Sequence, residues 1–425
     1  VADALASCVN QGTGVISNDS CYMFGVRALY YTTTFGTLYA PSTTGAMIMH
    51  LAQAAGGGLN YNNAESIYAL VQPNAPFQPT LTSAPDDLSL RIDYFTGSQI
   101  TTYGKPSKLS TYLSPYTLAI DANGTAWFAG KYLYTATPTG AFHAWTGNSY
   151  TAPGGAAFDP ISGDLFIGEV PGLYDSFVSS NLLYIRQPDG TTNSYNVCGK
   201  TACGQLISDG NGYIYASNYA NSLLRFTTSA VAQSSATTIA PTVLAIDYQR
   251  NPWVSDNNTI QWLSFNSGAA ATLRDTWTPA PPVRIMALGF IDAGYLMALD
   301  FDSTNLRFAV GYSYPNGTAQ IIPDTAANGT LGTGVTSPAF MQTNSLQQSI
   351  VTGVFGSKLG ISTFSSAAGQ STTMNLDTAT SPLGNLAVDN AGNIWVIQNN
   401  DANLGLYVGA TIPAPVPTVP ISPIY

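Results

Sequence analysis

The feature that most constrains the fold of this chain is a short sequence, apolar run, turn, apolar run, that recurs along most of its length. It is clearest at Ser381–Asn400 (SPLGNLAVDNAGNIWVIQNN) and at Pro115–Gly130 (PYTLAIDANGTAWFAG). In both places two apolar runs flank an Asp and a turn rich in Asn and Gly, which is typical of a β-hairpin. Because a single hairpin is only marginally stable, the repetition predicts a fold that assembles many such units.

Further copies with more variation occupy the middle of the chain. They lie at Gly154–Glu169, Gly204–Ser217, Pro241–Asp256, Arg284–Asp300 and, in the weakest form, Val335–Phe364. Successive copies start about 37–52 residues apart, which suits a four-stranded propeller blade and is too long for leucine-rich or hexapeptide repeats. The sequence therefore predicts a mainly β protein, a β-propeller of about seven four-stranded blades, with six blades as the alternative.

The composition indicates an extracellular protein. Only 8% of the 425 residues are charged, about a third of the usual share. The net charge of −10 and the absence of a Lys/Arg cluster exclude the electrostatic footprint of a nucleic-acid or anionic-lipid binder. No apolar run approaches the roughly 20 residues that span a bilayer. The chain begins Val-Ala-Asp without Met, so we expect that a signal peptide was removed or that the true N-terminus lies upstream.

Four cysteines fall into two close pairs. Cys8 and Cys21 bracket CVNQGTGVISNDSC, and Cys198 and Cys203 bracket CGKTAC. Of the three possible connectivities, pairing within each bracket is favoured because each pair then closes a short polar loop. A zinc site is the alternative, but the chain has only two histidines and neither lies near a C-x-x-C. We therefore predict two local disulfides and an oxidising compartment.

The regions outside the repeats suggest four parts. Residues 1–75 carry apolar residues at helical spacing, for example in CYMFGVRALYYTTTF, and predict a small lobe of three or four helices. Residues 76–97 form a Pro-rich connector and a strand at Leu88–Tyr94, which we expect to close the ring by joining the sheet of the last repeat. The blades would occupy 98–411, and 412–425 form a Pro-rich tail that favours polyproline II.

The repeats resemble the NHL-type propellers of secreted bacterial proteins. The loose pattern P-x-x-(I/L)-A-(I/V)-D-x-x-G-N-(I/V/A)-W-V is matched at Pro115–Phe128 and at Leu383–Val396. The N-terminal CVN…C, followed by SIYALVQPNAPFQPTL and SAPDDLSLRIDYF, is similar to a helical preamble that precedes such repeats in acidobacterial-type surface proteins. The resemblance implies a propeller fold and a place at the cell surface, and is almost silent about activity.

Most repeats carry an Asp directly after the first apolar run, and two interpretations are open. A ring of carboxylates could bind a cation, or each Asp could accept backbone N–H bonds within its own turn. Recurrence at one place in repeat after repeat favours the turn. The residues concerned are Asp121, Asp159, Asp209, Asp247 and Asp389.

Two enzymatic alternatives depend on few residues. A lactonase-like site needs several oxygens around one divalent metal, and the weak candidates are Glu169, Asp256 and Asp300, which end corresponding strands of three repeats; solvated strand-end residues are the favoured interpretation. The propeller lyases that resemble these repeats use a His as general acid or base. His143 is the only candidate, and its context AFHAWTG predicts a packed residue on an outer strand. No metal site, nucleotide site or cofactor is predicted.

The aromatic content points to contacts between molecules. The chain has 25 Tyr, 17 Phe and 6 Trp, residues that supply interface area at low entropic cost. The candidate interface residues lie in the lobe and the tail: Tyr22, Tyr30, Tyr31, Phe35, Tyr39, Ile421, Ile424 and Tyr425. N-x-S/T sequences permit glycosylation at Asn18, Asn123, Asn257, Asn316 and Asn328.

These observations together favour a non-enzymatic extracellular propeller at the cell surface, whose partners are copies of itself. Head-to-tail contacts of the lobe or the tail with the next propeller would build a filament or another surface assembly. One alternative is a metal-dependent lactonase-like hydrolase or a lyase with its site on the propeller axis. Another is a module that binds a glycan or another surface protein.

Overall fold

The structure is a computed structural model, and it describes the parts of the chain that form the propeller. The described residues are the strands at 30–32, 37–39 and 90–95, most of 118–313, and the segments 335–343, 349–355, 358–364, 371–375, 383–398 and 403–408. Apart from the strands at 30–32 and 37–39, the described strands belong to seven antiparallel sheets. We call these sheets blades 1 to 7.

Blades 1 to 3 each have four strands in chain order, the first innermost. Blade 1 contains β4 (Leu118–Ile120), β5 (Ala126–Ala129), β6 (Leu133–Ala136) and β7 (Phe142–Trp145). Blade 2 contains β8 (Pro153–Phe158), β9 (Leu165–Glu169), β10 (Leu183–Arg186) and β11 (Thr192–Tyr195). Blade 3 contains β12 (Leu206–Ser208), β13 (Ile214–Ser217), β14 (Ser222–Phe226) and β15 (Ala232–Ala236).

Blades 4 to 6 continue in the same order. Blade 4 contains β16 (Val243–Ile246), β17 (Pro252–Ser255), β18 (Ile260–Ser264) and β19 (Thr272–Trp277). The described strands of blade 5 are β20 (Arg284–Ile291), β21 (Tyr295–Phe301) and β22 (Leu306–Ser313). Blade 6 contains β23 (Val335–Thr343), β24 (Ser349–Phe355), β25 (Lys358–Phe364) and β26 (Ser371–Asn375).

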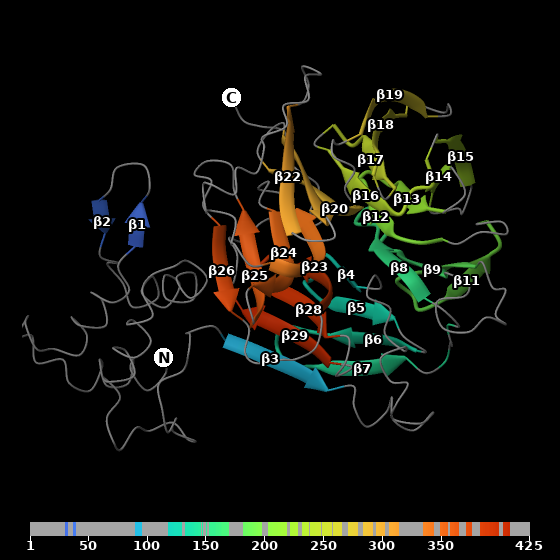
Figure 1. Cartoon of the computed structure of the whole chain (residues 1–425). Coiled ribbons are helices and arrows are strands. Elements are labelled where there is room, and N and C mark those ends of the chain that lie inside the picture. The colour runs from blue at the N-terminus through green and yellow to red at the C-terminus, as the bar shows by residue number, and fades with distance from the viewer. Residues whose placement is uncertain are drawn as a thin grey trace, which may run out of the picture.

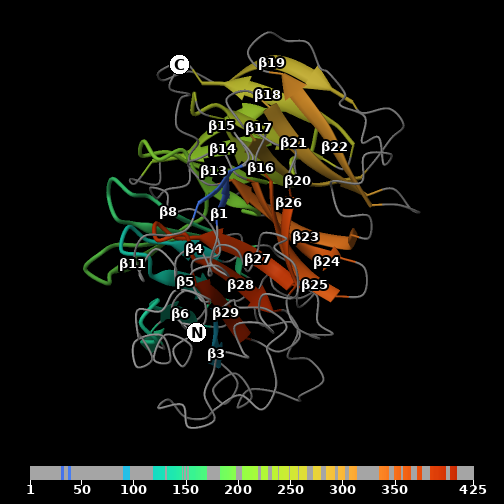
Figure 2. The same cartoon turned by 90° about the vertical axis from the view of Figure 1, so that its left-hand side faces the viewer.

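Blade 7 joins two distant parts of the chain. Its strands β27 (Leu383–Val388), β28 (Ile394–Gln398) and β29 (Asn403–Val408) are followed in the sheet by β3 (Leu90–Phe95). Tyr94 lies opposite Leu404 in the antiparallel register, and Figure 2 shows β27, β28, β29 and β3 in this order. This is the pairing predicted for the period-two strand Leu88–Tyr94, and it gives the otherwise free edge of β29 a partner.

The innermost strands close a ring. Each contacts the innermost strand of the next blade, and β27 of blade 7 contacts β4 of blade 1. Figure 1 shows the blades following one another from green through yellow to red, with the red strands of blade 7 beside the teal strands of blade 1. The chain is therefore a β-propeller with seven described blades, as the repeats predicted.

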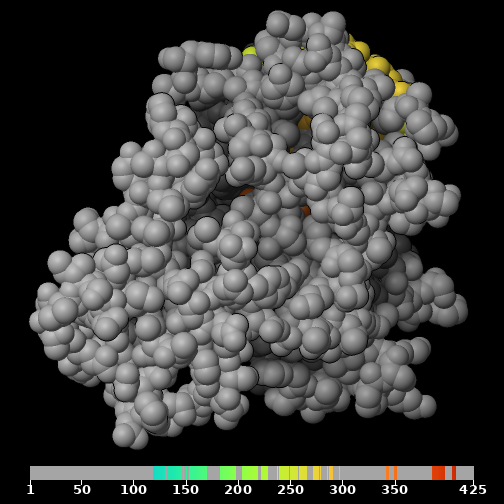
Figure 3. Space-filling view, turned by 60° about the vertical axis from the view of Figure 1, so that its left-hand side comes forward, coloured from blue at the N-terminus to red at the C-terminus, as the bar shows by residue number. Residues whose placement is uncertain are grey.

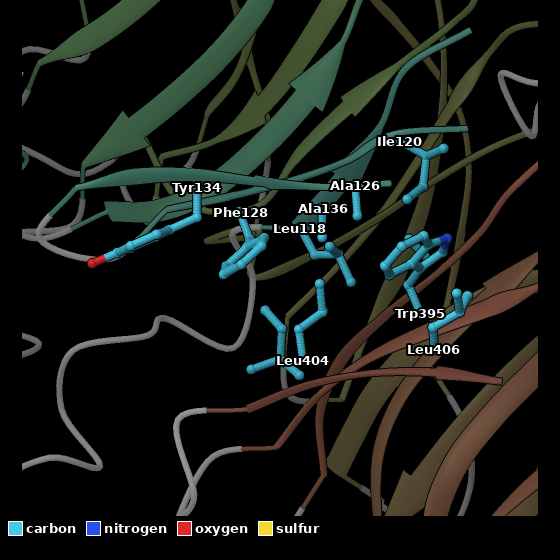
Figure 4. Close-up of a cluster of buried hydrophobic side chains, with 11 residues drawn as sticks. Leu118, Ile120, Ala126, Phe128, Tyr134, Ala136, Trp395, Leu404 and Leu406 are labelled. Atoms are coloured by element: carbon cyan, nitrogen blue, oxygen red, sulfur yellow. The ribbon is translucent and has the colours of Figure 1, made fainter. Parts of the chain in front are cut away.

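The cores of the propeller lie between neighbouring blades. Because side chains alternate along a strand, each sheet has one face for each neighbouring blade. Between blades 7 and 1, Phe128 packs in one cluster with Trp395 and Leu404 (Figure 4). Full burial of one such side chain contributes about 1.5–3 kcal/mol. Equivalent clusters join blades 1 and 2, 2 and 3, 3 and 4, and 4 and 5, so the ring is stabilised by many similar interfaces.

On the side of the molecule shown in Figure 3, described residues reach the surface only in small areas, among them yellow ones at the upper edge. Among the described residues, no helix is long and apolar enough to cross a bilayer.

One predicted helix is wrong where the structure describes it. β1 (Tyr30–Thr32) and β2 (Thr37–Tyr39) form an antiparallel pair, with Tyr30 opposite Tyr39, inside a segment whose apolar spacing predicted a helix. The run YYTTTFGTLY is aromatic and β-branched, and such residues favour strands. The other predicted helices of 1–75, the Pro-rich connector and the tail 412–425 lie outside the described residues, and the domain boundaries remain predictions.

Candidate functional site

The recurring Asp residues are buried and hold the turns of the inner hairpins. In blades 1, 4 and 7 the Asp also accepts the indole N–H of a Trp six residues later. The Nε1–Oδ2 distances are 2.9 Å from Trp127 to Asp121, 3.1 Å from Trp253 to Asp247 and 3.0 Å from Trp395 to Asp389. The second oxygen of each Asp accepts the backbone N–H four residues later, at 2.8–3.0 Å.

The turns of Asp159 in blade 2 and Asp209 in blade 3 use the same chemistry without a Trp. Asp209 Oδ1 accepts the backbone N–H groups of Asn211 at 2.7 Å and Tyr213 at 3.1 Å. Asp159 Oδ2 accepts the hydroxyl of Ser162 at 2.8 Å. The turn interpretation of the five Asp residues is therefore confirmed, because each of them accepts hydrogen bonds within its own hairpin.

Burial raises the pKa of two of these carboxyls. It raises the pKa of Asp247 to about 6, although hydrogen bonds from Asn251 and Trp253 lower it. Burial likewise raises the pKa of Asp209. Desolvation dominates in both, since the side chains are almost fully removed from water.

Each Asp turn contains a residue with a positive φ. In blades 1 and 7 it is the third residue after the Asp, +78° at Gly124 and +80° at Gly392, and in blade 2 it is the fourth, +76° at Gly163; glycine adopts this conformation without steric cost. In blade 4 the third residue after the Asp is Arg250, with φ +67°, and its guanidinium donates to the Asp209 carbonyl of blade 3 at 3.1 Å. An unfavourable backbone conformation is thus combined with a hydrogen bond between blades.

Of the three metal candidates, the structure describes the side chains of Glu169 and Asp256. Glu169 is buried at the end of β9, where it accepts the Tyr184 hydroxyl at 3.3 Å. Asp256 Oδ1 accepts two backbone N–H groups of its own turn, at 2.9 and 2.8 Å. Asp300 lies on β21 in blade 5, and its side chain is outside the described set. Within the described part of the chain, no group of three His, Cys, Asp or Glu residues could hold a metal ion.

A tyrosine cluster that the sequence analysis missed surrounds Glu169. The rings of Tyr150 and Tyr184 meet edge to face with centroids 4.9 Å apart. Burial raises the pKa of Tyr150 to about 12 and raises the pKa of Tyr184, for which the Glu169 charge is the next cause. Both hydroxyls therefore stay protonated at neutral pH. The protonated Tyr184 hydroxyl can therefore donate the hydrogen bond to Glu169.

The innermost strands of the described blades surround a central cavity. It has a volume of about 160 Å³ and is lined by residues from the innermost strands of all seven blades. No titratable side chain is among its described lining residues. The polar side chain of Gln205 instead ties blade 3 to blade 4, since its Oε1 accepts the backbone N–H of Leu244 at 2.8 Å. The cavity residues thus hold the ring together.

A group of exposed aromatic side chains lies on the outer strand of blade 1. Phe142 and Trp145 of β7 are each 37% exposed, and His143 between them is exposed as well. The position of His143 on an outer strand was predicted from its sequence context. We call Phe142, His143 and Trp145 the aromatic edge.

Residues of blades 1 and 2 pack against the inner side of the aromatic edge. The Arg186 guanidinium of blade 2 lies 4.3 Å from the ring centroid of Trp145 and donates to the Gly190 carbonyl at 2.7 Å. Trp127 stacks beside Trp145, with centroids 6.2 Å apart and planes 16° apart. His143 meets the Trp145 ring edge to face at 4.5 Å. These contacts come from two blades. The residues next to Arg186 in the sequence do not predict that its side chain lies against Trp145.

The outer strands of the other described four-stranded blades have a different character. β11 (TNSY), β15 (AQSSA) and β26 (STTMN) are rich in small polar residues. β19 (TLRDTW) carries Arg274 and Asp275, and the register of its pairing shifts. β3 (LRIDYF), the outer strand of blade 7, carries Arg91 and Asp93. Charges, irregular registers and polar side chains are the means by which proteins protect sheet edges from unwanted pairing. β7 (FHAW) has no Asp, Glu, Lys or Arg and a regular register, and His143 is its one polar side chain.

The other predicted site residues are described only in part. Cys203 is buried and disulfide-bonded, whereas Cys8, Cys21 and Cys198 lie outside the described residues, so the pairing remains a prediction. Among the glycosylation candidates, Asn123 is exposed in the blade 1 turn. The backbones of Tyr30, Tyr31 and Tyr39 lie in β1 and β2. The candidates outside the described residues are Asn18, Asn257, Asn316, Asn328, Tyr22, Phe35, Ile421, Ile424 and Tyr425.

Comparison with known proteins supports the fold alone. No family model and no curated protein matches the chain. Virginiamycin B lyase from Staphylococcus aureus superposes with a TM-score of 0.55 at 13% identity, over 76% of this chain and 99% of that one. A streptogramin B lyase gives 0.51 at 12% identity over 70% and 93%, and a chain of the mitotic checkpoint complex gives 0.52 at 12% over 70% and 90%.

Proposed function

We propose that this chain is a non-enzymatic extracellular propeller that acts through contacts with copies of itself, as a structural subunit of a surface assembly. The observation that carries the proposal is the aromatic edge, an exposed strand edge without charge on a protein of net charge −10. The predicted lobe and the Pro-rich tail would supply further contacts. The extracellular setting depends on the low charged content and on the resemblance to secreted NHL-type propellers.

The described polar groups support a structural role. The five turn carboxylates each accept hydrogen bonds within their own hairpins. The central cavity of about 160 Å³ is smaller than the roughly 300–1,000 Å³ of ordinary ligand pockets. The described propeller thus offers more for packing and assembly than for chemistry.

The proposal is tested by the association state of the purified full chain. We expect the weight-average mass in sedimentation experiments to rise with protein concentration, and negative-stain images to show ordered multimers. A chain that stays monomeric at the highest concentration, with and without the tail residues 412–425, would overturn the proposal.

A lyase is the second candidate, because the fold matches lyases over nearly their whole length. A further matching structure, of virginiamycin B lyase from Staphylococcus aureus with quinupristin, is of a histidine-to-alanine variant described as catalytically inactive. In this chain the only His in the described propeller is His143 on the outer strand β7, away from the axis. Incubation with quinupristin, followed by mass spectrometry, should give no product; product formation that the His143→Ala variant loses would favour the lyase.

The hydrolase and glycan-binding alternatives have equally direct tests. A metal-dependent activity that Glu169→Gln abolishes would establish the hydrolase. Binding on a glycan array that Trp145→Ser abolishes would establish the glycan-binding module. We expect neither, because Glu169 is buried and one face of Trp145 is covered by Arg186.

A further inference from the structure

We infer that β7 pairs edge to edge with β7 of a second copy, so that the sheet of blade 1 continues antiparallel into the sheet of its partner. The inference rests on the proposed self-association and adds the surface, the register and the residues that would carry it.

The free edge of β7 can accept a strand. In the described structure β7 pairs with β6 alone, with Trp145 opposite Leu133. The bond from the Thr137 N–H to the Ala141 carbonyl, 2.9 Å long, marks a hydrogen-bonded position of this hairpin. Since such positions alternate in antiparallel pairs, His143 and Trp145 bond inward to β6. The N–H and C=O of Ala144 therefore point to the free edge.

The outer strands β7, β15 and β26 contain no charged residue, and β7 alone among these three carries aromatic side chains. Two molecules of net charge −10 repel one another, so they approach most easily where the surface carries no negative charge. β7 contains no Asp or Glu, and the Arg186 guanidinium lies directly behind Trp145. The polar outer strand β11 has Asp189 in the turn that precedes it, and β19 contains Asp275.

The side-chain pattern selects the register. In a two-fold antiparallel pair, opposite residues lie on the same sheet face, so their numbers must have the same parity. Centring the pair on Ala144 brings the two outward Ala144 backbones together as a hydrogen-bonded pair. By symmetry, His143 of each copy then lies opposite Trp145 of the other copy. Both pairs occupy non-hydrogen-bonded positions, where opposite side chains are closer. The same imidazole–indole contact already exists within the chain at 4.5 Å.

The aromatic edge needs little ordering to bind. Trp145 is fixed by Arg186 and Trp127, and Phe142 lies 5.9 Å from the Tyr134 ring. A rigid surface loses little side-chain entropy on association. Aromatic cross-strand pairs contribute modestly, and a four-residue strand buries much less than the roughly 1,200 Å² of a stable interface. Pairing through β7 alone should therefore be weak, and it would be strengthened in an assembly with further contacts.

The test uses two proline variants of the full chain. Ala144→Pro removes the outward N–H of β7 and leaves the bonds to β6 intact. Its matched control is Ser194→Pro in β11. The bond from Gln187 N–H to Thr191 carbonyl, 2.8 Å long, gives Ser194 the same outward position in a polar strand. We expect Ala144→Pro to weaken self-association by about tenfold or more and Ser194→Pro to leave it unchanged, with circular dichroism showing that both fold.

Cysteine variants test the register. Under oxidation Ala144→Cys should form a covalent dimer, because the two positions face each other across the two-fold axis, whereas Ser194→Cys should not. If the wild-type chain associates and Ala144→Pro associates equally well, the edge inference fails and the proposed function survives. If the wild type is monomeric, both fail. A glycan that alters tryptophan fluorescence without changing the mass would assign the edge to glycan binding and overturn the inference.

Discussion

In blade 1 the inner hairpin buries its aromatic residues and the outer strand exposes them. Phe128 on β5 is fully buried, and the indole N–H of Trp127 bonds to Asp121, whereas Phe142 and Trp145 on β7 are each 37% exposed. The inner pattern recurs in blades 4 and 7 because every inner hairpin must fit the same ring. Among the outer-strand side chains whose burial the structure describes, exposed aromatic rings occur on β7. Repetition therefore marks architecture, and departure from it marks the candidate for function.

The largest effect is expected at the inner hairpin of blade 7. Trp395→Ala should lower the free energy of unfolding by about 3–5 kcal/mol, because Trp395 is fully buried between blades 7 and 1 and its indole bonds to Asp389. Urea denaturation measures the change. Trp395→Phe, which keeps an aromatic ring and loses only the N–H donor, should cost less than half as much. If Trp395→Ala lowers the free energy of unfolding by less than about 1 kcal/mol, the inner hairpins are not a major source of the stability of the ring.

The next effect is the pH dependence of Asp247. Its pKa is raised from 3.8 to about 6 in the folded chain, so the folded state takes up a proton before the unfolded state does. Stability should rise as pH falls through 6 and should level off below the unfolded value near 4. The gain is at most about 3 kcal/mol, visible as a shift of the urea midpoint between pH 7.5 and 4.5.

The control for this effect is Asp247→Asn, which cannot titrate. Its stability should be lower than that of the wild type at acidic pH and should lack the step near pH 6. An equal step in the variant would assign the pH dependence to other carboxyls, such as Asp209, whose pKa is also raised by burial.

A close contact between blades 5 and 6 should give a smaller loss. A Cβ added at Gly289 would lie 2.6 Å from Thr343 Oγ1 and 2.9 Å from Ser349 Oγ. These hydroxyls bond to the backbone N–H and C=O of Phe290 at 2.7 and 3.2 Å. Gly289→Ala should therefore cost about 1–3 kcal/mol in the free energy of unfolding. Gly140→Ala, with no atom within 4 Å but a φ of +95°, separates backbone strain from crowding; an equal loss in both would exclude the crowding argument.

The smallest effect is expected in the blade 4 turn. Arg250 occupies a positive-φ position that is Gly124 in blade 1 and Gly392 in blade 7. Arg250→Gly and Arg250→Ala both lose the bond to the Asp209 carbonyl, but only Ala keeps the backbone strain. Arg250→Gly should be the more stable of the two by about 1 kcal/mol, measured by thermal denaturation. The opposite order would mean that the turn changes its conformation when Arg250 is replaced.

Local sequence was sufficient for the hairpins and for the ring. The spacing from Asp389 to Trp395 lies within one turn and two strands, so its geometry follows from neighbouring residues. The strand pattern of Leu88–Tyr94 likewise indicated a member of a sheet, and the need to close the ring indicated which sheet. The helix predicted at Tyr30–Thr32 was wrong because a short apolar run is compatible with both the helical and the strand periodicity. Local sequence could not decide between them.

The aromatic edge could not be predicted in the same way. Trp145 and Arg186 belong to different blades, and their contact depends on how far one sheet is rotated against the next. The exposure of Phe142 also depends on which strand of its blade is outermost and on what packs beside it. The aromatic residues singled out from the sequence lay instead in the N-terminal lobe and the C-terminal tail.

The sequence by itself determined the repeated hairpins, the approximate number of blades and the strand that closes the ring, because these depend on alternation, turn residues and spacing within short segments. Only the tertiary structure decided which side chains meet between blades and which stay exposed. The physical reason is that burial is a property of neighbouring sheets: Trp395 on an inner strand and Trp145 on an outer strand are the same residue type, and their positions in the ring alone make one a core residue and the other a surface for contact.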